Sequence, residues 1–359
     1  MSGAAPESIS AGRGGGTIWV GQGLLSEAGR RLVSPSGRFF LVSVPAARLA
    51  AGAVRGALAG RIVLDFELED GEDSKTLASV DAIATAALAA GLRRDDAFVA
   101  VGGGVATDVT GFAAAVLLRG VAWNAVPTTT AGMADAAIGG KTGVNHARGK
   151  NLLGAFHPPR TVLIDPDCLA TLPERDFRAG LVEAFKAAWI ADAALAVRAA
   201  ESLPALLARD ASALRELLAG AVRVKAGLVA ADPRDAGPRR LLNFGHTLGH
   251  AIEAASGYGT LRHGEAVAWG IAAALEISRR RAGLPGEDAA AARAVLLRLG
   301  PFPPPERRPD RLAELLAQDK KSTSRGLASV LLERLGRARV DESVSVQDWV
   351  EAAAIMTLS

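Results

Sequence analysis

Short β-branched runs alternate with alanine-rich stretches through the first half of the chain. Five runs have the apolar character of buried strands, namely FFLVSV (39–44), RIVLDF (61–66), DAFVAV (96–101), AWNAVP (122–127) and TVLID (161–165). Between them, stretches such as 79–91 carry alanine at helical spacing. Strands that alternate with helices favour an α/β fold with a parallel sheet. We therefore expect such a domain over residues 17–170.

After about Cys168 the strand signals nearly vanish. The pattern predicts helices at 174–202, 204–231, 241–256, 264–283, 287–299 and 310–318, and a stiff loop at 301–309. We therefore expect a mainly α-helical second domain over residues 171–359. Residues 1–16 are small and polar, without the apolar core of a secretory signal, so we expect a disordered N-terminus.

Composition and charge exclude several classes of protein. The chain has 359 residues, 49% of them hydrophobic and 22% charged, and its net charge of +3 comes from interspersed side chains. This balance argues against a nucleic-acid partner. The apolar run 266–277 is too short to cross a bilayer, which argues against a membrane protein. The single cysteine, Cys168, cannot form an internal disulfide, so a cytoplasmic location is expected.

A glycine turn follows the third predicted strand. Gly102, Gly103 and Gly104 lie between that strand and a helix, where backbone amides can approach a pyrophosphate. The next strand ends in Thr128 to Thr130, at the edge where parallel sheets bind ligands. The spacing is not GxGxxG, and such a turn is often only a turn. Together the two features favour a nucleotide site.

A second glycine-rich segment, 138–151, contains Lys141, Lys150 and Asn151. It lacks the spacing of a Walker A loop. The plain interpretation is a solvated basic loop. However, the lysines lie among glycines after an apolar run, which favours inward-facing cations that bind an anion.

Residues 241–263, LLNFGHTLGHAIEAASGYGTLRH, contain three of the five histidines. His246 and His250 are four apart and share a helix face, and His263 follows. A single histidine on an apolar helix is more often a core residue, but three within eighteen residues indicate a metal site. Thr247 excludes the HExxH motif of zinc proteases. The remaining ligand of a three-ligand site must then come from elsewhere.

Glu183 is the candidate for that ligand. It lies on the apolar helix GLVEAFKAAWI (180–190), three residues before Lys186. The alternative is an ordinary surface ion pair. The helix offers little polar surface, and a carboxylate in an apolar setting is costly unless it is paired or bound to a metal.

A set of motifs then resembles a known family. GGGVATD, PTTT, GGKTGVN, GKNLLGAF, LVEAFK, LLNFGHTLGHAIE and LRHGEAVAWG follow, in order, the motifs of bacterial 3-dehydroquinate synthases over residues 17–335. The resemblance implies a Rossmann-like NAD-binding domain and an α-helical domain that binds metal and substrate. It also implies a homodimeric lyase that uses NAD and one divalent metal, zinc or cobalt.

The implied reaction converts 3-deoxy-D-arabino-heptulosonate 7-phosphate to 3-dehydroquinate and phosphate, on the shikimate route to aromatic amino acids. It proceeds by transient oxidation with NAD, β-elimination of phosphate, reduction, ring opening and an intramolecular aldol closure. The departing phosphate is thought to act as its own base in this family. That would suit a site rich in cations.

The resemblance also assigns residues. The implied metal ligands are Glu183, His246 and His263. The implied substrate and catalytic residues are Asp135, Lys141, Asn151, Lys186, Lys225, Arg239, Asn243, His250, Lys320, Lys321 and, across a dimer interface, Arg119. The implied cofactor contacts are Asp70, Gly71, Glu72, Asp73, Ser74, Lys75, Gly104, Val105, Ala106, Thr107, Asp108, Thr128, Thr129, Lys141, Lys150, Cys168, Leu169, Ala170 and Thr171. Of these, we expect Lys141, Asn151, Arg119 and one of Lys320 and Lys321 to bind phosphate, and Arg239 with Lys225 to bind the carboxylate.

The chain departs from the family at two places. Ser43 and Val44 occupy the end of the first predicted strand, where the family has an aspartate that contacts the adenosine ribose. PTTTAGMADAA replaces PTTLLAQVDSS. Two other functions stay open, a cyclase of the inosose or valiolone type and a metal-dependent polyol dehydrogenase. A polyol dehydrogenase would release NADH and would not need the phosphate-binding lysines.

Overall fold

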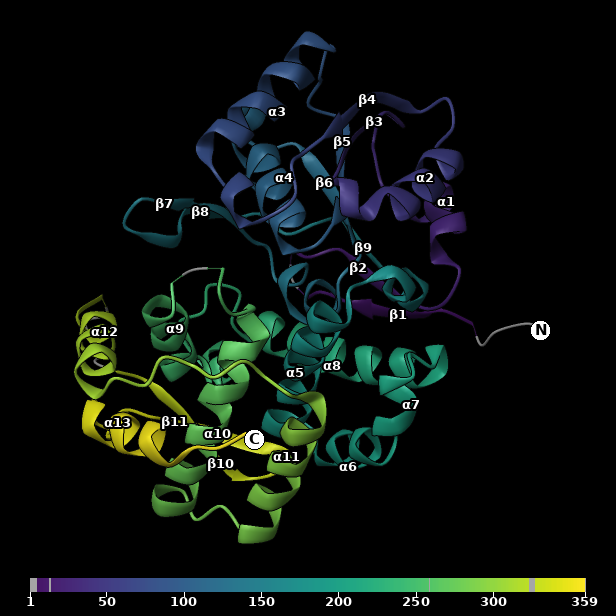
Figure 1. Ribbon diagram of the computed structural model, residues 1–359. Helices are drawn as coiled ribbons and strands as arrows, with labels where there is room; N and C mark the ends of the chain where they lie inside the picture. The colour runs from purple at the N-terminus through teal and green to yellow at the C-terminus, as the bar shows by residue number, and fades with distance from the viewer. Residues whose placement is uncertain (1–4, 13, 258, 323–326, 359) are drawn as a thin grey trace. The chain divides into compact units, whose positions relative to one another are not determined.

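The computed structural model describes residues 5–12, 14–257, 259–322 and 327–358, and the chain forms two compact units (Figure 1). The N-terminal unit comprises residues 1–173 and 214–234, and the C-terminal unit comprises residues 174–213 and 235–359. The predicted single boundary near residue 170 is therefore incomplete, because residues 214–234 belong to the N-terminal unit. That segment is most of helix α8 (Ala211–Ala231).

The N-terminal unit is built on a sheet whose described strands number seven. Their order is β1 (Glu7–Ser10), β2 (Thr17–Val20), β9 (Thr161–Ile164), β6 (Ala122–Pro127), β5 (Ala97–Gly102), β3 (Phe39–Ser43) and β4 (Ile62–Glu67). All neighbours in this order pair in parallel except β1, which pairs antiparallel with β2. The predicted α/β fold with its parallel sheet is confirmed. Strands β3 and β5 are buried throughout, because both faces of the sheet are covered.

Helices cover this sheet on both faces. Helices α3 (Leu77–Ala89) and α4 (Gly104–Val116) lie on one side, and α1 (Ala28–Arg31) and α2 (Arg48–Ala57) lie on the other (Figure 1). From β3 the chain crosses to β4 at the edge of the sheet, whereas from β5 it crosses the opposite way to β6. The connections therefore diverge between β3 and β5. Sheets of this kind bind ligands beside the carboxyl ends of strands at such a point.

Two expectations for this unit are wrong. Residues 7–10 are not disordered, because Ile9 pairs with Ile18 and the segment extends the sheet. The glycine-rich segment is not a loop either, since β7 (Lys141–His146) and β8 (Gly149–Phe156) form an antiparallel ribbon. The ribbon extends beyond helix α4 (Figure 1). On β8 the large apolar side chains of Leu152 and Phe156 are 59% and 54% exposed, so the strand lacks the pattern of a buried one.

The C-terminal unit is mainly helical, as predicted. Its helices are α5 (Glu174–Ala191), α6 (Ala193–Glu201), α7 (Leu203–Leu207), α9 (His246–Ala255), α10 (His263–Arg281), α11 (Gly286–Leu299), α12 (Pro309–Ser322) and α13 (Val346–Ile355). Helix α10 is buried along most of its length and forms the centre of this unit. The predicted helix 174–202 ends at Ala191. Asp192 then accepts a hydrogen bond from the amide of Leu195 and begins α6.

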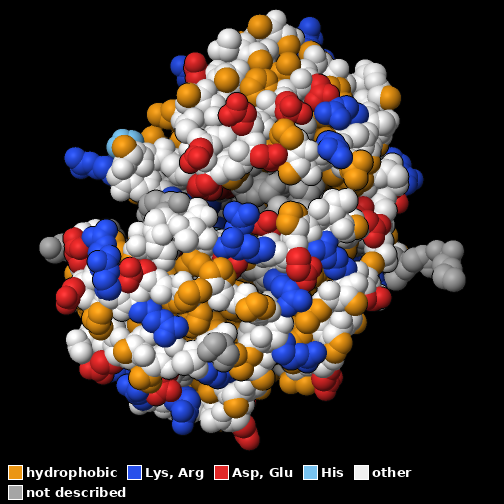
Figure 2. Space-filling view, in the orientation of Figure 1, with side chains coloured by type: hydrophobic (Ala, Val, Ile, Leu, Met, Phe, Trp, Pro, Cys, Tyr) orange, Lys and Arg blue, Asp and Glu red, His pale blue; other side chains and the backbone are white. Residues whose placement is uncertain are grey.

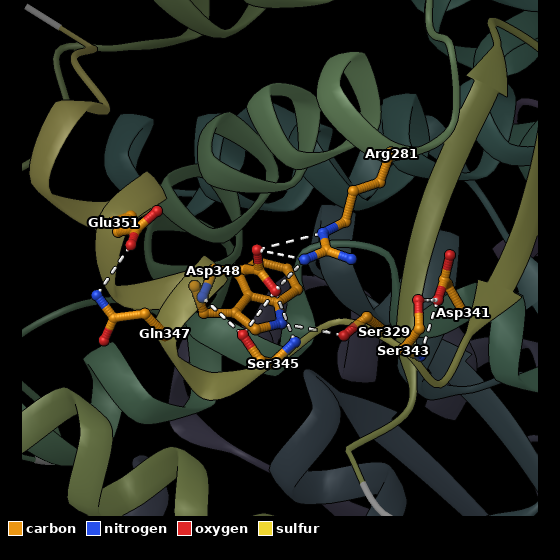
Figure 3. A network of polar contacts seen from close by, with 9 residues as sticks. Arg281, Ser329, Asp341, Ser343, Ser345, Gln347, Asp348 and Glu351 are labelled. Carbon is orange, nitrogen blue, oxygen red and sulfur yellow. Dashed lines mark hydrogen bonds and ion pairs between the residues drawn. The ribbon is translucent and has the colours of Figure 1, made fainter.

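The last part of the chain also differs from expectation. Strands β10 (Ser329–Arg334) and β11 (Arg337–Asp341) form a hairpin where strand signals are weak. Helix α13 packs beside it, and Figure 3 shows the contacts that hold it. Arg281 binds both carboxylate oxygens of Asp348 at 2.8 Å, and Trp349 Nε1 donates to Ser329 Oγ at 3.0 Å. These polar contacts link distant segments, which local sequence pattern does not reveal.

The surface matches the interspersed charge of the sequence. On the face shown in Figure 2, acidic and basic side chains are both present on each unit, interspersed with apolar and neutral ones. Among the described residues, none of the helices has the length and apolar character needed to span a membrane.

Candidate active site

Glycines bring three helices of the C-terminal unit unusually close together. A Cβ atom at Gly270 in α10 would lie 1.9 Å from the carbonyl oxygen of Gly245, the residue before α9. A Cβ atom at Gly264 in α10 would lie 1.9 Å from the carbonyl oxygen of Ala179 in α5. Neither position can carry a side chain without movement of backbone. The start of α9 therefore lies directly against α10 at Gly270, and the first turn of α10 lies directly against α5.

This packing gathers a carboxylate and two imidazoles. Glu183, one turn after Ala179, has its Oε1 atom 3.5 Å from His263 Nε2 and 3.9 Å from His246 Nε2. Its Oε2 atom lies 2.6 Å from Lys186 Nζ, and both side chains are about 2% exposed. Both Glu183 oxygens are fully buried, and neither accepts a hydrogen bond of ordinary geometry from the described residues. Within the described part of the chain, the ion pair with Lys186 is therefore the closest polar contact of this carboxylate.

Hydrogen bonds orient both imidazoles toward Glu183. His246 Nδ1 lies 3.3 Å from the carbonyl oxygen of Phe244, and His263 Nδ1 lies 3.2 Å from Glu253 Oε2. A carbonyl and a carboxylate can only accept, so each neutral ring carries its proton on Nδ1. The unprotonated Nε2 atoms then face Glu183. This is the arrangement in which histidines bind a metal ion.

Glu253 is a residue that sequence reasoning missed. It lies on the same face of α9 as His246 and His250, at the spacing i, i+4, i+7, and it is only 4% exposed. Burial of the His263 ring lowers its pKa, but the Glu253 hydrogen bond and the charge of Glu183 outweigh this, and the net pKa of His263 is raised. The HxxxHxxE spacing could have indicated Glu253.

The third histidine completes a cluster. The His250 ring centroid lies 5.3 Å from that of His246 and 5.8 Å from that of His263. One nitrogen of each ring lies within 4.8 Å of the others, so the three histidines could also hold a metal ion. The Glu183 distances are shorter, and the Glu183 oxygens are buried. The structure therefore offers two overlapping ligand sets, which share His246 and His263.

Further ion pairs fix the start of α10. Arg175 of α5 donates two hydrogen bonds of 2.7 Å to Glu265, and Arg262 Nε lies 2.8 Å from Asp176 of α5. Glu265 also accepts a hydrogen bond from the backbone amide of Arg262. These contacts hold His263, which lies between Arg262 and Glu265, at a fixed place beside α5.

In the N-terminal unit, the predicted cofactor segments lie after the carboxyl ends of parallel strands. Residues 70–75 follow β4, 104–108 open α4 after β5, Thr128 and Thr129 follow β6, and 168–171 follow β9. A Cβ atom at Gly102 would lie 2.6 Å from the Cβ of Ala106, so the turn needs glycine there. The N-terminus of α4 begins directly after this turn. Its free backbone amides and helix dipole favour an anion.

An ion pair links two of these segments. Lys75 Nζ lies 2.5 Å from Asp108 Oδ2, and both side chains are largely buried. Burial, partly offset by Lys75, raises the pKa of the Asp108 carboxyl to about 6. Nearby, Asn145 of β7 donates to Glu72 at 2.7 Å, which ties the ribbon to the same segment. Asp70 accepts a hydrogen bond of 2.9 Å from the amide of Ala46, beside the end of β3 where Ser43 and Val44 stand.

A second pair joins two predicted substrate residues. Lys225 of α8 donates 2.5 Å hydrogen bonds to the carbonyl and the carboxylate of Asp135, which lies in the π-helical turn Gly132–Ala136. Residues far apart in sequence are therefore brought together within this unit. By contrast, burial raises the pKa of the Cys168 thiol to about 12, so this cysteine is not a nucleophile.

The remaining predicted residues are spread over several elements. Arg239 is buried and Asn243 exposed in the 3-10 helix Pro238–Asn243, immediately before α9. Lys141 begins β7, whereas Lys150 and Asn151 lie near the other end of the ribbon. Arg119 is exposed after α4. Lys320 and Lys321 fall at the end of α12, where side chains lie outside the described part of the chain.

Comparison with known families decides the relationship. Residues 65–179 match the family described as 3-dehydroquinate synthase N-terminal, and residues 180–322 match 3-dehydroquinate synthase C-terminal. The chain belongs to the 3-dehydroquinate synthase family. Among curated members of the family, the 3-dehydroquinate synthase of Methylococcus capsulatus is 42% identical over 341 residues, which cover 94% of this chain and 95% of the relative.

Solved structures agree with this 3-dehydroquinate synthase fold. A 2-deoxy-scyllo-inosose synthase complexed with carbaglucose-6-phosphate, NAD+ and Co2+ is 26% identical, with a TM-score of 0.86. It matches 98% of this chain and 100% of that one. A 2-epi-5-epi-valiolone synthase from Streptomyces hygroscopicus subsp. jinggangensis, with NAD+ and Zn2+ bound, is 28% identical with a TM-score of 0.83. The coverage is 99% of this chain and 98% of that one.

Proposed function

We propose that this chain is a 3-dehydroquinate synthase that converts 3-deoxy-D-arabino-heptulosonate 7-phosphate to 3-dehydroquinate and phosphate, with NAD and one divalent ion, zinc or cobalt, as cofactors. Membership of the family supports this activity over the two alternatives. The observation that carries it in the structure is the meeting of Glu183, His246 and His263.

The cluster fits a metal ion by its chemistry and its spacing. Ligand atoms bound tetrahedrally at about 2.0–2.1 Å from zinc are roughly 3.3–3.4 Å apart. The distances of 3.5 and 3.9 Å from Glu183 Oε1 to the two Nε2 atoms are close to this value. Lys186 pairs with Oε2 of the buried Glu183 carboxylate, whereas Oε1 accepts no ordinary hydrogen bond from the described residues and faces the two imidazoles, as a metal ligand would. We therefore assign Glu183, His246 and His263 as ligands, and we place His250 on the substrate side.

The cofactors supply two kinds of chemistry when bound: NAD takes up and returns a hydride, and the metal polarises substrate hydroxyls. The chain's own residues do the rest. Lys186 binds Oε2 of Glu183 at 2.6 Å, so that Oε1 faces the imidazoles. His263 is 45% exposed, which leaves room for a substrate beside the ligand set.

Cationic side chains would bind the two anionic groups of the substrate. We assign the phosphate to Lys141 and Asn151, with Arg119 and one of Lys320 and Lys321, and the carboxylate to Arg239 with Lys225. Charge-assisted hydrogen bonds of this kind are among the stronger ones. Asp135 already holds Lys225 in place through its carboxylate. The same proposal places NAD at the segments 70–75, 104–108, 128–129 and 168–171, together with Lys141 and Lys150.

We also propose that the enzyme is a cytoplasmic homodimer in which Arg119 serves the partner subunit. Leu118 and Arg119 adopt left-handed backbone conformations, with φ of 50° and 67°, and such strain in non-glycine residues is typical of functional sites. Large apolar side chains are also exposed at Val116, the last residue of α4, and at Leu152 and Phe156 of β8. Sedimentation of the purified protein measures this assembly directly.

One assay tests the activity. The purified protein is incubated with the heptulosonate phosphate, catalytic NAD and zinc, and both phosphate and dehydroquinate are measured. We expect both products to form with no net rise in NADH absorbance. Accumulation of NADH would indicate a polyol dehydrogenase, and turnover of a hexose phosphate without a carboxylate would indicate another cyclase. Either result would contradict the proposed function.

A further inference from the structure

Glu253 is a buried carboxylate that the proposed reaction does not use directly. It is 4% exposed in α9, and its Oε2 lies 3.2 Å from Nδ1 of His263, the first residue of α10. Burial of a carboxylate costs free energy unless it has a partner. The contact joins two helices and reaches the edge of the imidazole ring opposite to the one that faces Glu183.

We propose that Glu253 is a positioning residue for the metal centre, which sets the tautomer and orientation of His263. This inference rests on the proposed metal site. Because a carboxylate accepts, it keeps the proton on Nδ1 and leaves the lone pair on Nε2. That nitrogen then points at Glu183 Oε1, 3.5 Å away.

The two histidines of the cluster are oriented by different means. His246 uses the backbone carbonyl of Phe244, which is fixed by the fold. His263 uses a side chain, and its ring is 45% exposed, compared with 12% for His246. The more exposed ring has fewer packing contacts to hold it, so it depends more on its hydrogen bond. Loss of Glu253 should therefore act mainly through His263.

A purely structural role is the competing explanation. In that case the Glu253–His263 contact only ties α9 to α10, and its loss would lower stability without a specific effect on metal binding. A matched control exists in the same unit. Asp348→Asn removes the ion pair between α10 and α13 that Figure 3 shows, at the other end of α10 from His263. It costs stability and leaves the histidines untouched.

The experiment compares the wild type with Glu253→Gln, Glu253→Asp and Asp348→Asn. Zinc affinity is measured on metal-free protein by competition with a chromophoric chelator, and Tm is measured on the same metal-free samples. Changes in residues that orient a ligand typically weaken metal affinity by about 10–100-fold. We expect a loss of this size for Glu253→Gln, a smaller loss for Glu253→Asp, and an unchanged affinity for Asp348→Asn. The visible spectrum of the cobalt form should also change for Glu253→Gln.

A second comparison identifies the residue through which Glu253 acts. In a His263→Ala background, Glu253→Gln should cause no further loss of zinc affinity. An unchanged affinity in Glu253→Gln, or an equal loss with and without His263, would overturn the inference. If Glu253→Gln does not fold, Glu253→Asp carries the same comparison. Failure of the wild type to bind zinc, or binding that His263→Ala leaves intact, would instead refute the proposed metal site.

Discussion

The contact between Gly264 and Ala179 determines whether His263 can reach Glu183. The substitution Gly264→Ala would place a methyl carbon 1.9 Å from the carbonyl oxygen of Ala179. Carbon and oxygen atoms in close contact are normally about 3.3–3.6 Å apart, so α10 and α5 must separate by roughly 1.5 Å. Overpacking of this kind costs roughly 1–3 kcal/mol, which leaves a domain of this size folded.

The displacement is large in relation to the metal site. His263 precedes Gly264 directly, and Glu183 lies one helical turn after Ala179. Separation of the helices along the line between them would increase the 3.5 Å distance from Glu183 Oε1 to His263 Nε2 to roughly 5 Å. Two ligands with bonds of about 2.1 Å to one ion cannot be more than about 4.2 Å apart. Gly264→Ala should therefore lose one ligand.

The assay is zinc binding by chelator competition, together with kcat/KM. We expect zinc affinity to fall by at least about 100-fold, because one of three protein ligands is lost. Gly286→Ala is the matched control, since a Cβ atom at Gly286 in α11 meets nothing within 4 Å. It should bind zinc as the wild type does. Wild-type affinity in a folded Gly264→Ala protein would refute the reasoning, because the helices would then adjust without moving the ligands.

Two further predictions concern buried ion pairs. Glu183→Gln should abolish zinc binding, and it should lower the free energy of unfolding by about 3–5 kcal/mol because it leaves the Lys186 ammonium buried without its partner. The double variant Glu183→Gln with Lys186→Met should regain stability but not zinc binding. Urea denaturation that showed no loss of stability in Glu183→Gln would contradict this prediction. For Asp108 the folded pKa of about 6 lies above the ordinary value of 3.8, so the folded state holds more protons than the unfolded state between these values, and stability rises as pH falls through that window. Relative to Asp108→Asn, the wild type should therefore gain roughly 2.4 kcal/mol between pH 7.5 and pH 4, and a constant difference in urea titrations would count against the raised pKa.

Much of the fold follows from pattern, and the exceptions have physical causes. Strands β3, β5, β6 and β9 are buried apolar runs, because both faces of the sheet are covered there, and such runs are visible in sequence; β4, at the edge, is more exposed but still β-branched and apolar enough to be predicted. The ribbon of β7 and β8 is different. Its strands pair with each other, and on β8 Leu152 and Phe156 face solvent, so the sequence resembles a loop. The hairpin of β10 and β11 was missed for a different reason, since it depends on contacts with distant residues, such as Leu332 with Ser278 of α10 and Ser329 with Trp349 of α13.

The candidate site was partly visible in the sequence. The spacing of His246, His250 and His263 predicted a cluster, and the apolar helix around Glu183 marked a carboxylate that needs a cation. The roles of particular residues came from the resemblance to a family and stay predictions. Glu253 was not found, because its contact with His263 exists only where glycines let α9 and α10 meet. The HxxxHxxE spacing places Glu253 on the histidine face of α9, but it does not reveal that the partner of Glu253 is His263 of α10.

The return of residues 214–234 to the N-terminal unit limits how the protein can be divided. In that unit, α8 supplies Lys225 to Asp135 and Arg223 to Glu7 of β1. A chain cut after Pro173 would lack these partners and would expose the surface that α8 covers. Separate production of this half therefore requires a peptide spanning 214–234, either added in trans or fused through a new linker. No single cut in the sequence therefore separates the two folding units.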